Sequence, residues 1–223
     1  MARRRDSARG SGADDRIVYI VDEIFFSQPD VISRLKIDTR DRICFVSTIE
    51  EPKTDTIDLL VEALISEGFS TPATIVGMGG GITLDTAKAV ANLLSNGGHA
   101  EQYQGWDLVK FPAIHKIGIP TISGTGAEAT RTCVMTNTRT GLKLGMNSDH
   151  TVYDHIILDP DITLTVPRDQ NFYTGMDAYI HCIEAMAGSY RNAVGDAYSR
   201  ETIYLAVRNF FLTICKALRR GSS

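Results

Sequence analysis

Short apolar runs alternate with longer amphipathic stretches along the first half of the chain. Four runs, rich in β-branched residues, occupy residues 16–21, 43–46, 73–77 and 116–122. Nearly continuous apolar runs of this length are typical of strands buried on both faces of a parallel sheet. Between them, residues 55–68 and residues 84–95 have helical spacing. Gly68 ends the first stretch, and Gly97 and Gly98 end the second. This alternation predicts an α/β domain with a parallel sheet.

The third predicted strand leads directly into a glycine-rich turn at residues 77–85. Gly79, Gly80 and Gly81 carry no side chains, so backbone N–H groups and the positive end of the next helix can approach a phosphate. The spacing is not the GxGxxG fingerprint, and a tight turn that only packs closely is the alternative. Asp22 ends the first strand, where a carboxylate can accept a hydrogen bond from a ribose hydroxyl and favour NAD over NADP. Acidic residues also end strands for solubility.

A second polar loop follows the fourth predicted strand. Residues 123–130, SGTGAEAT, combine hydroxyls and glycines at the carboxyl end of that strand, where open α/β sheets bind ligands. The alternative is an ordinary loop in which Ser123 or Thr125 caps a helix.

Residues 174–185 are predicted to be helical and contain a candidate metal-binding pair. Asp177 and His181 are four residues apart, which places their side chains on one helical face. A carboxylate and an imidazole that point the same way are two thirds of a facial site for a divalent metal. The alternative is an Asp favoured by the helix dipole beside a His that packs against a neighbour.

Composition narrows the class of protein. The 223 residues have a net charge of -4, which gives no reason to expect nucleic acid or an anionic membrane as partner. The four cysteines are scattered without CxxC spacing, as expected for reduced thiols in the cytoplasm. Residues 1–15 are polar, with no apolar segment of a targeting signal, and are expected to be disordered.

Four motifs in a fixed order resemble one family. They are GMGGGITLDTAKA at 77–89, IPTISGTGAEAT at 119–130, DP at 159–160 and GMDAYIHCIEA at 175–185. Together they resemble the iron-containing, group III alcohol dehydrogenases over roughly residues 16–199. The stretches YQGWDL at 103–108 and LGMNSDHTVYDHIILDPD at 144–161 are similar to the branch of 3-deoxy-D-manno-octulosonate 8-oxidases, which oxidise the terminal hydroxyl of an eight-carbon sugar acid.

The resemblance implies a Rossmann-like dinucleotide-binding domain at 16–166 and the start of an all-α domain, truncated, at 167–223. Gly79, Gly80 and Gly81 would cradle the pyrophosphate of NAD(H), Thr121 and Thr125 would line the nucleotide, and Asp22 would meet the adenosine ribose. Asp177 and His181 would be the metal ligands and the catalytic centre, with Fe2+ as the expected ion and Zn2+ as the other candidate.

The implied reaction oxidises a primary alcohol to an aldehyde through a metal-assisted alkoxide and hydride transfer, on a small alcohol or sugar-acid substrate. No nucleic-acid or membrane partner is expected, and a homodimer is possible. A dehydroquinate-synthase-like lyase that uses the same metal and NAD is one alternative. A nucleotide-binding remnant without activity is the other.

The sequence departs from the family pattern at two places near the predicted site. Ile82 follows the three glycines where the family has serine, so we expect weaker cofactor contacts. The family completes its metal site with two histidines from later helices, whereas the other histidines of this chain, at positions 99, 115, 150 and 155, all precede Asp177. The sequence is therefore expected to be a fragment.

Overall fold

The computed structural model describes residues 14–208, which form two compact units. The first unit contains residues 14–121 and 127–162. Among the described residues, the second contains Ile122–Gly126 and residues 163–208. The assignment of Ile122–Gly126 to the second unit has no counterpart in the sequence prediction.

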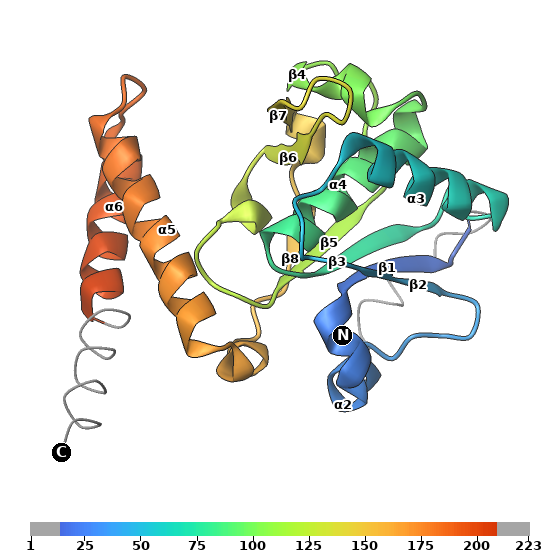
Figure 1. Cartoon of the computed structure of the whole chain (residues 1–223), viewed down its shortest axis with the longest axis horizontal. Coiled ribbons are helices and arrows are strands. Elements are labelled where there is room, and N and C mark those ends of the chain that lie inside the picture. The colour runs from blue at the N-terminus through green and yellow to red at the C-terminus, as the bar shows by residue number, and fades with distance from the viewer. Residues whose placement is uncertain (1–13, 209–223) are drawn as a thin grey trace. The chain divides into compact units, whose positions relative to one another are not determined.

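The first unit is built on a parallel sheet, as predicted (Figure 1). Its strands, in the spatial order β2-β1-β3-β5-β8, are β2 (Arg42–Val46), β1 (Ile17–Asp22), β3 (Thr74–Gly79), β5 (Lys116–Pro120) and β8 (His155–Ile156). The chain moves from β1 outward to β2 and then returns to β3 on the other side of β1. The strand order therefore reverses between β1 and β3, which is where open α/β sheets bind ligands.

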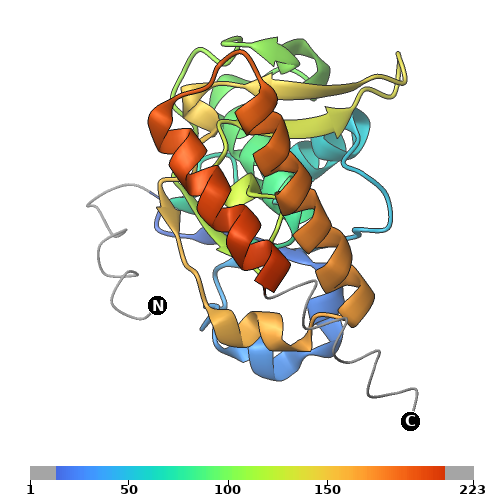
Figure 2. The same cartoon turned by 90° about the vertical axis from the view of Figure 1, so that its left-hand side faces the viewer.

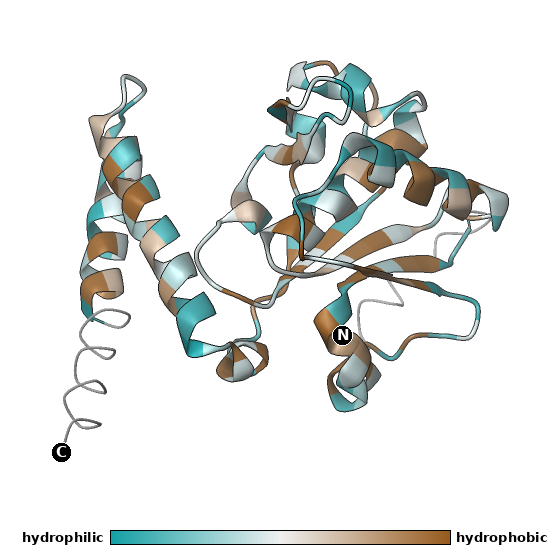
Figure 3. Ribbon diagram, viewed as in Figure 1, coloured by the Kyte–Doolittle hydropathy of each residue, from teal (hydrophilic) through white to brown (hydrophobic). Residues whose placement is uncertain are grey.

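Two long helices cover one face of this sheet, and short helical segments cover the other. α3 (Thr54–Ser66) and α4 (Gly81–Asn96) pack on the face that receives Val18 and Ile20 of β1. η1 (Glu23–Ser27) and α2 (Pro29–Ser33) lie on the opposite face, with Tyr19 and Val21. Successive residues of a strand point to opposite faces, so a continuous apolar run serves two cores. Figure 3 shows this run as brown segments along the strands.

A small three-stranded sheet packs against α4 and extends the core. It has the order β4-β7-β6 and consists of β4 (Gly105–Trp106), β7 (Lys143–Asn147) and β6 (Thr132–Thr136). The turns η2 (Ala100–Tyr103), η3 (Ala127–Ala129), η4 (Asp149–Thr151) and η5 (Pro160–Thr165) connect the longer elements. Cys133 and Met135 of β6 and Met146 of β7 are buried in the same cluster as the inner faces of α3 and α4.

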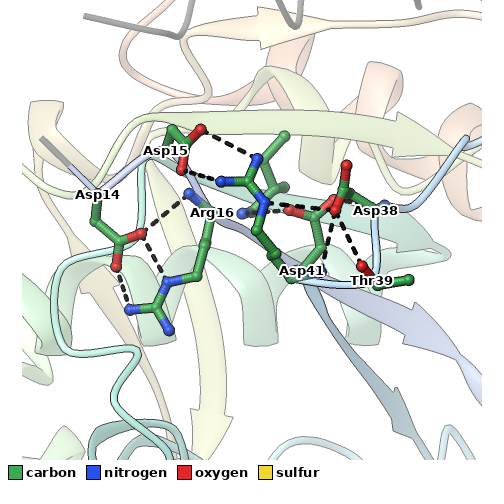
Figure 4. A network of polar contacts seen from close by, with 8 residues as sticks. Asp14, Asp15, Arg16, Asp38, Thr39 and Asp41 are labelled. Atoms are coloured by element: carbon green, nitrogen blue, oxygen red, sulfur yellow. Dashed lines mark hydrogen bonds and ion pairs between the residues drawn. The ribbon is translucent and has the colours of Figure 1, made fainter. Parts of the chain in front are cut away.

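A polar network fixes the start of β1 (Figure 4). Asp14 accepts hydrogen bonds from the backbone N–H and the guanidinium of Arg16, at 3.1 and 2.8 Å. Asp15 pairs with Arg40 at 3.1 Å, and Asp41 accepts the backbone N–H of the first residue of β1 at 3.0 Å. Asp14 and Asp15, the last two residues of the segment expected to be disordered, are therefore ordered parts of the first unit. Residues 1–13 lie outside the described residues.

The second unit contains a pair of helices, α5 (Arg168–Ala187) and α6 (Ala193–Ala206), that lie side by side (Figures 1 and 2). The side chain of Asn192 accepts the backbone N–H of Gly195 at 2.8 Å and so caps the start of α6. Between residues 14 and 208 no helix is long and apolar enough to cross a membrane.

Candidate functional site

The glycine turn joins the end of β3 to the start of α4. Gly79 is the last residue of β3, Gly80 is the N-cap, and Gly81 is the first helical residue. A Cβ on Gly79 would lie 2.5 Å from Oγ1 and 2.6 Å from Cβ of Thr83, so only glycine fits there. No side chain caps α4, and its first turn has no acidic residue. The N–H groups at this helix start are therefore suited to an anionic ligand.

Thr83 adds an unusual polar atom at the same turn. Its side chain is fully buried, and its hydroxyl has no hydrogen-bond partner among residues 14–208. A buried hydroxyl without a partner costs free energy unless a ligand or water satisfies it. Together with the side-chain-free cradle of Gly79, Gly80 and Gly81, this orphaned hydroxyl fits a site that a phosphate completes.

Asp22 lies beside this turn at the carboxyl end of β1. The parallel register pairs Val21 with Met78, so Asp22 is level with Gly79 on the neighbouring strand. Its Oδ1 accepts the backbone N–H of Ile24 at 3.1 Å and caps η1, which agrees with a structural use of this carboxylate. Burial raises the pKa of Asp22, and its hydrogen bonds oppose that shift.

The two threonines predicted to line the nucleotide belong to different units. Thr121 is buried at the end of β5, and its backbone N–H donates to the carbonyl of Gly79 at 3.0 Å. The glycine turn and the end of β5 are thereby held together. Thr125 belongs to the five-residue piece of the second unit, Ile122–Gly126.

The predicted metal-binding pair lies on α5. Asp177 Oδ2 and His181 Nδ1 are 3.5 Å apart, and their side chains are 42% and 57% exposed. For metal–ligand bonds of about 2.1 Å, two donors of a tetrahedral site are about 3.4 Å apart, so this separation fits a shared divalent cation. Within residues 14–208 no group of three or more His, Cys, Asp or Glu side chains is arranged to hold a metal ion.

A buried polar cluster behind the glycine turn was missed by sequence reasoning. Lys88 of α4 is fully buried, and its Nζ donates to the carbonyls of Thr130 and Thr132 at 3.0 and 2.8 Å. Asp85, one turn earlier, accepts the backbone N–H of Val134 at 2.9 Å. Its other oxygen is 3.9 Å from Lys88 Nζ, which is an ion pair without a hydrogen bond. The signal was available in Asp85 and Lys88, which are the two charged residues of an otherwise uncharged helix.

Burial dominates the protonation of this cluster. It raises the pKa of Asp85 to about 6, against the attraction of Lys88 and the hydrogen bond from Val134. It lowers the pKa of Lys88, and the nearby Asp85 opposes that shift. Through their hydrogen bonds, both residues hold the start of β6 against α4. The charge of Asp85 changes at mildly acidic pH because its pKa is about 6.

Comparison with known proteins decides the family. The family model described as iron-containing alcohol dehydrogenase matches residues 6–160. The chain belongs to this family. That result confirms the family predicted from the four ordered motifs, and the parallel sheet confirms the predicted α/β fold.

Individual relatives agree with this assignment. The chain is 36% identical to the sulfoacetaldehyde reductase of Bilophila wadsworthia over 159 residues, 71% of this chain and 40% of that protein. It is 34% identical to the NAD-dependent methanol dehydrogenase of Bacillus methanolicus over 131 residues, 59% of this chain and 34% of that protein. A crystal structure of 1,3-propanediol oxidoreductase superposes with a TM-score of 0.82 at 25% identity, covering 96% of this chain and 55% of that one. This iron-containing alcohol dehydrogenase chain thus spans 34–55% of the length of these relatives.

Proposed function

We propose that this chain acts in the interconversion of a primary alcohol and an aldehyde, with NAD(H) as hydride carrier and a divalent metal held by Asp177 and His181. The observation that carries the proposal is the pair itself, a carboxylate and an imidazole 3.5 Å apart on one exposed stretch of α5. The membership of the iron-containing alcohol dehydrogenase family supports it.

The chemistry of the two donors suits Fe2+ and also Zn2+. A carboxylate oxygen is a hard ligand that neutralises part of the cation's charge, and a neutral imidazole is a borderline ligand that both metals accept. When bound, such a metal acts as a Lewis acid that lowers the pKa of an alcohol hydroxyl. Two protein ligands hold a divalent metal weakly.

The nucleotide is proposed to bind at the glycine turn of the first unit. The start of α4 offers backbone N–H groups to the pyrophosphate, and Gly79, Gly80 and Gly81 let it approach the backbone. Asp22, level with Gly79, is proposed to accept a ribose hydroxyl, and Thr121 and Thr125 to line the nucleotide. The name of the methanol dehydrogenase relative states NAD dependence, and one structural neighbour, a sulfoacetaldehyde reductase at 23% identity, was solved with NAD+.

The substrate proposed from the sequence motifs is the terminal hydroxyl of 3-deoxy-D-manno-octulosonate. The relatives carry the names of a sulfoacetaldehyde reductase, a methanol dehydrogenase and 1,3-propanediol dehydrogenases, so a two-carbon sulfonate and short alcohols are the competing substrates. These names are those of reductases and dehydrogenases, and they lend no support to the lyase alternative.

Metal content provides the first test. Bound Fe2+ is measured by equilibrium dialysis under anaerobic conditions for the protein and for Asp177→Ala and His181→Ala. His99→Ala is the matched control, because His99 Nδ1 lies 3.1 Å from Asp58 Oδ2 in an Asp–His pair that is not at the proposed site. We expect both α5 variants to lose bound iron and the control to retain it. Equal iron in all four proteins would refute the metal assignment.

Turnover provides the second test. The iron-loaded protein is incubated with NAD and each of four alcohols: the octulosonate, isethionate, 1,3-propanediol and methanol. NADH and aldehyde should appear together with at least one of them. Aldehyde that forms only after air is admitted would show that oxygen, and not NAD, is the electron acceptor. Product without net NADH would favour the lyase. Nucleotide binding without metal binding or turnover would identify a binding remnant.

A further inference from the structure

The five residues Ile122–Gly126, which we call the crossing segment, leave the first unit and return to it. Thr121 before the segment and Ala127 after it belong to the first unit, whereas the segment itself belongs to the second. Both flanks are fixed in the first unit. The backbone N–H of Thr121 donates to the carbonyl of Gly79 at 3.0 Å, and Ala127 is buried in one cluster with Leu84 and Tyr153.

The middle of the crossing segment is pressed against α5 at Gly124. A Cβ on Gly124 would overlap the carbonyl oxygen of Thr174 and would lie 2.5 Å from its carbonyl carbon and 2.7 Å from its Cβ. The obstacle is helix backbone, which cannot swing aside as the end of a flexible side chain can. Gly124 also has a φ of +146°, a conformation that L-residues rarely adopt. Backbone therefore meets backbone at this point, and only glycine permits it.

The contact lies next to the proposed metal-binding pair in the helix. Thr174 is buried, and its hydroxyl donates to the carbonyl of Gln170 at 3.1 Å, so it belongs to a well-formed turn of α5. Asp177 and His181 follow Thr174 by three and seven residues, and residues with this spacing lie along one stripe of a helix. The crossing segment therefore touches α5 on the stripe that carries the pair.

We propose that Gly124 is a positioning residue, which seats the crossing segment on α5 and thereby couples the nucleotide-binding glycine turn to the Asp177/His181 pair. The coupling runs from Gly79 through its hydrogen bond to Thr121, along the chain to Gly124, and from there to Thr174. The identities of the two coupled ligands, NAD(H) and a divalent metal, rest on the proposed function. A side chain on Gly124 lifts the segment from α5 while both ligand sites keep their own residues.

The test compares Gly124→Ala with Gly126→Ala in the full chain. Gly126 has a φ of +66°, but a Cβ there would meet no atom of the described residues within 4 Å. Both substitutions place alanine in a conformation that L-residues avoid, and only the first adds an overlap with α5. Dissociation constants for NADH and for Zn2+, the redox-stable probe, are measured for each protein alone and in the presence of the other ligand.

In the parent protein we expect one ligand to change the affinity for the other by roughly 5-fold or more, with the same factor in both directions because coupling is reciprocal. Gly124→Ala should bring this factor close to one while each ligand still binds alone, and Gly126→Ala should retain it. A parent factor of one, or equal coupling in both variants, would overturn the proposal.

Hydrogen exchange separates this inference from the proposed function. Amides of α5 near Thr174 should exchange faster in Gly124→Ala than in the parent protein, and Gly126→Ala should leave them unchanged. This readout needs neither ligand. Absence of NADH and Zn2+ binding in the parent protein would therefore refute the proposed function. Hydrogen exchange would still decide whether Gly124 holds the crossing segment against α5. Unchanged exchange in Gly124→Ala would refute the seating itself.

Discussion

Replacing Lys88 with methionine tests whether the buried polar cluster holds the start of β6 against α4. Lys88 Nζ donates to the carbonyl of Thr130 at 3.0 Å, to its hydroxyl at 3.0 Å and to the carbonyl of Thr132 at 2.8 Å. Methionine keeps most of the apolar stem of lysine, so it removes the charge and its hydrogen bonds without opening a large cavity. The first unit should lose stability because buried acceptors lose their donor.

The magnitude follows from the groups that are left behind. A hydrogen bond to a charged donor contributes about 1.5–3 kcal/mol, and removing one partner of a buried ion pair costs about 3–5 kcal/mol. The substitution also relieves the desolvation of the ammonium group, which is evident in the lowered pKa of Lys88. We therefore expect a loss of about 3 kcal/mol in the free energy of unfolding near pH 7.5.

Lys116→Met is the matched control. Lys116 is also buried, and its Nζ donates to one carbonyl, that of His150, at 3.0 Å. Its acidic neighbour Asp154 lies 3.7 Å away and is 45% exposed, so water can replace the lysine there. We expect a loss of about 1 kcal/mol for this variant, since fewer buried groups are left without a partner.

Urea unfolding followed by the fluorescence of Trp106 provides the assay, because Trp106 is the sole tryptophan and lies in the first unit. The cost of Lys88→Met should increase between pH 5 and pH 8. Near pH 5 the carboxyl of Asp85 is already largely protonated, since its pKa is about 6, and little attraction to Lys88 is lost. A cost no greater than that of Lys116→Met, or a cost that falls as pH rises, would refute the role of the buried polar cluster in holding β6 against α4.

Three further substitutions probe the same unit. The parent should lose about 3 kcal/mol of stability as pH rises from about 4 to 6, because the folded pKa of Asp85, about 6, exceeds the ordinary 3.8. Asp85→Asn should abolish this loss, which urea titrations across this pH range measure. Tyr153→Phe should cost about 1–2 kcal/mol in the same assay, because its buried hydroxyl donates to a carbonyl of α4 at 2.8 Å. Gly79→Ala should weaken NADH binding at least tenfold through its overlap with Thr83, whereas Gly97→Ala, with open space around its Cβ, should not; a fluorescence titration compares them.

The buried strands were predicted closely because their signal is local. Each central strand of the parallel sheet is a continuous apolar run, and the observed limits of β1, β2 and β5 differ from the predicted ones by one or two residues. The end of β3 was wrong by two residues. The predicted strand ended at Gly77, whereas β3 continues through Met78, which pairs with Val21 of β1, to Gly79. A Cβ on Gly77 would lie 2.6 Å from the hydroxyl of Tyr153, so this glycine serves close packing inside the sheet.

The proposed metal-binding pair could also be predicted from sequence, because both residues belong to one helix. The spacing of Asp177 and His181 fixes their mutual position once α5 forms, and the structure places them 3.5 Å apart. Their roles, and those of Asp22, Thr121 and Thr125, stay predictions. The polar cluster could not be predicted in the same way, because Lys88 meets partners 42 and 44 residues away, in a loop and a strand whose positions depend on the whole fold.

The same distant contacts bear on the proposal that a loop of glycines and hydroxyls serves as a binding surface. Residues 123–130 have a composition that favours mobility, and ordering such a loop on ligand binding costs conformational entropy. Here its start is fixed through the hydrogen bond of Thr121, and its end through the bonds of Lys88 to Thr130. Gly124 fixes its middle against α5. Because much of this ordering occurs on folding, less of it would oppose the proposed binding of a nucleotide.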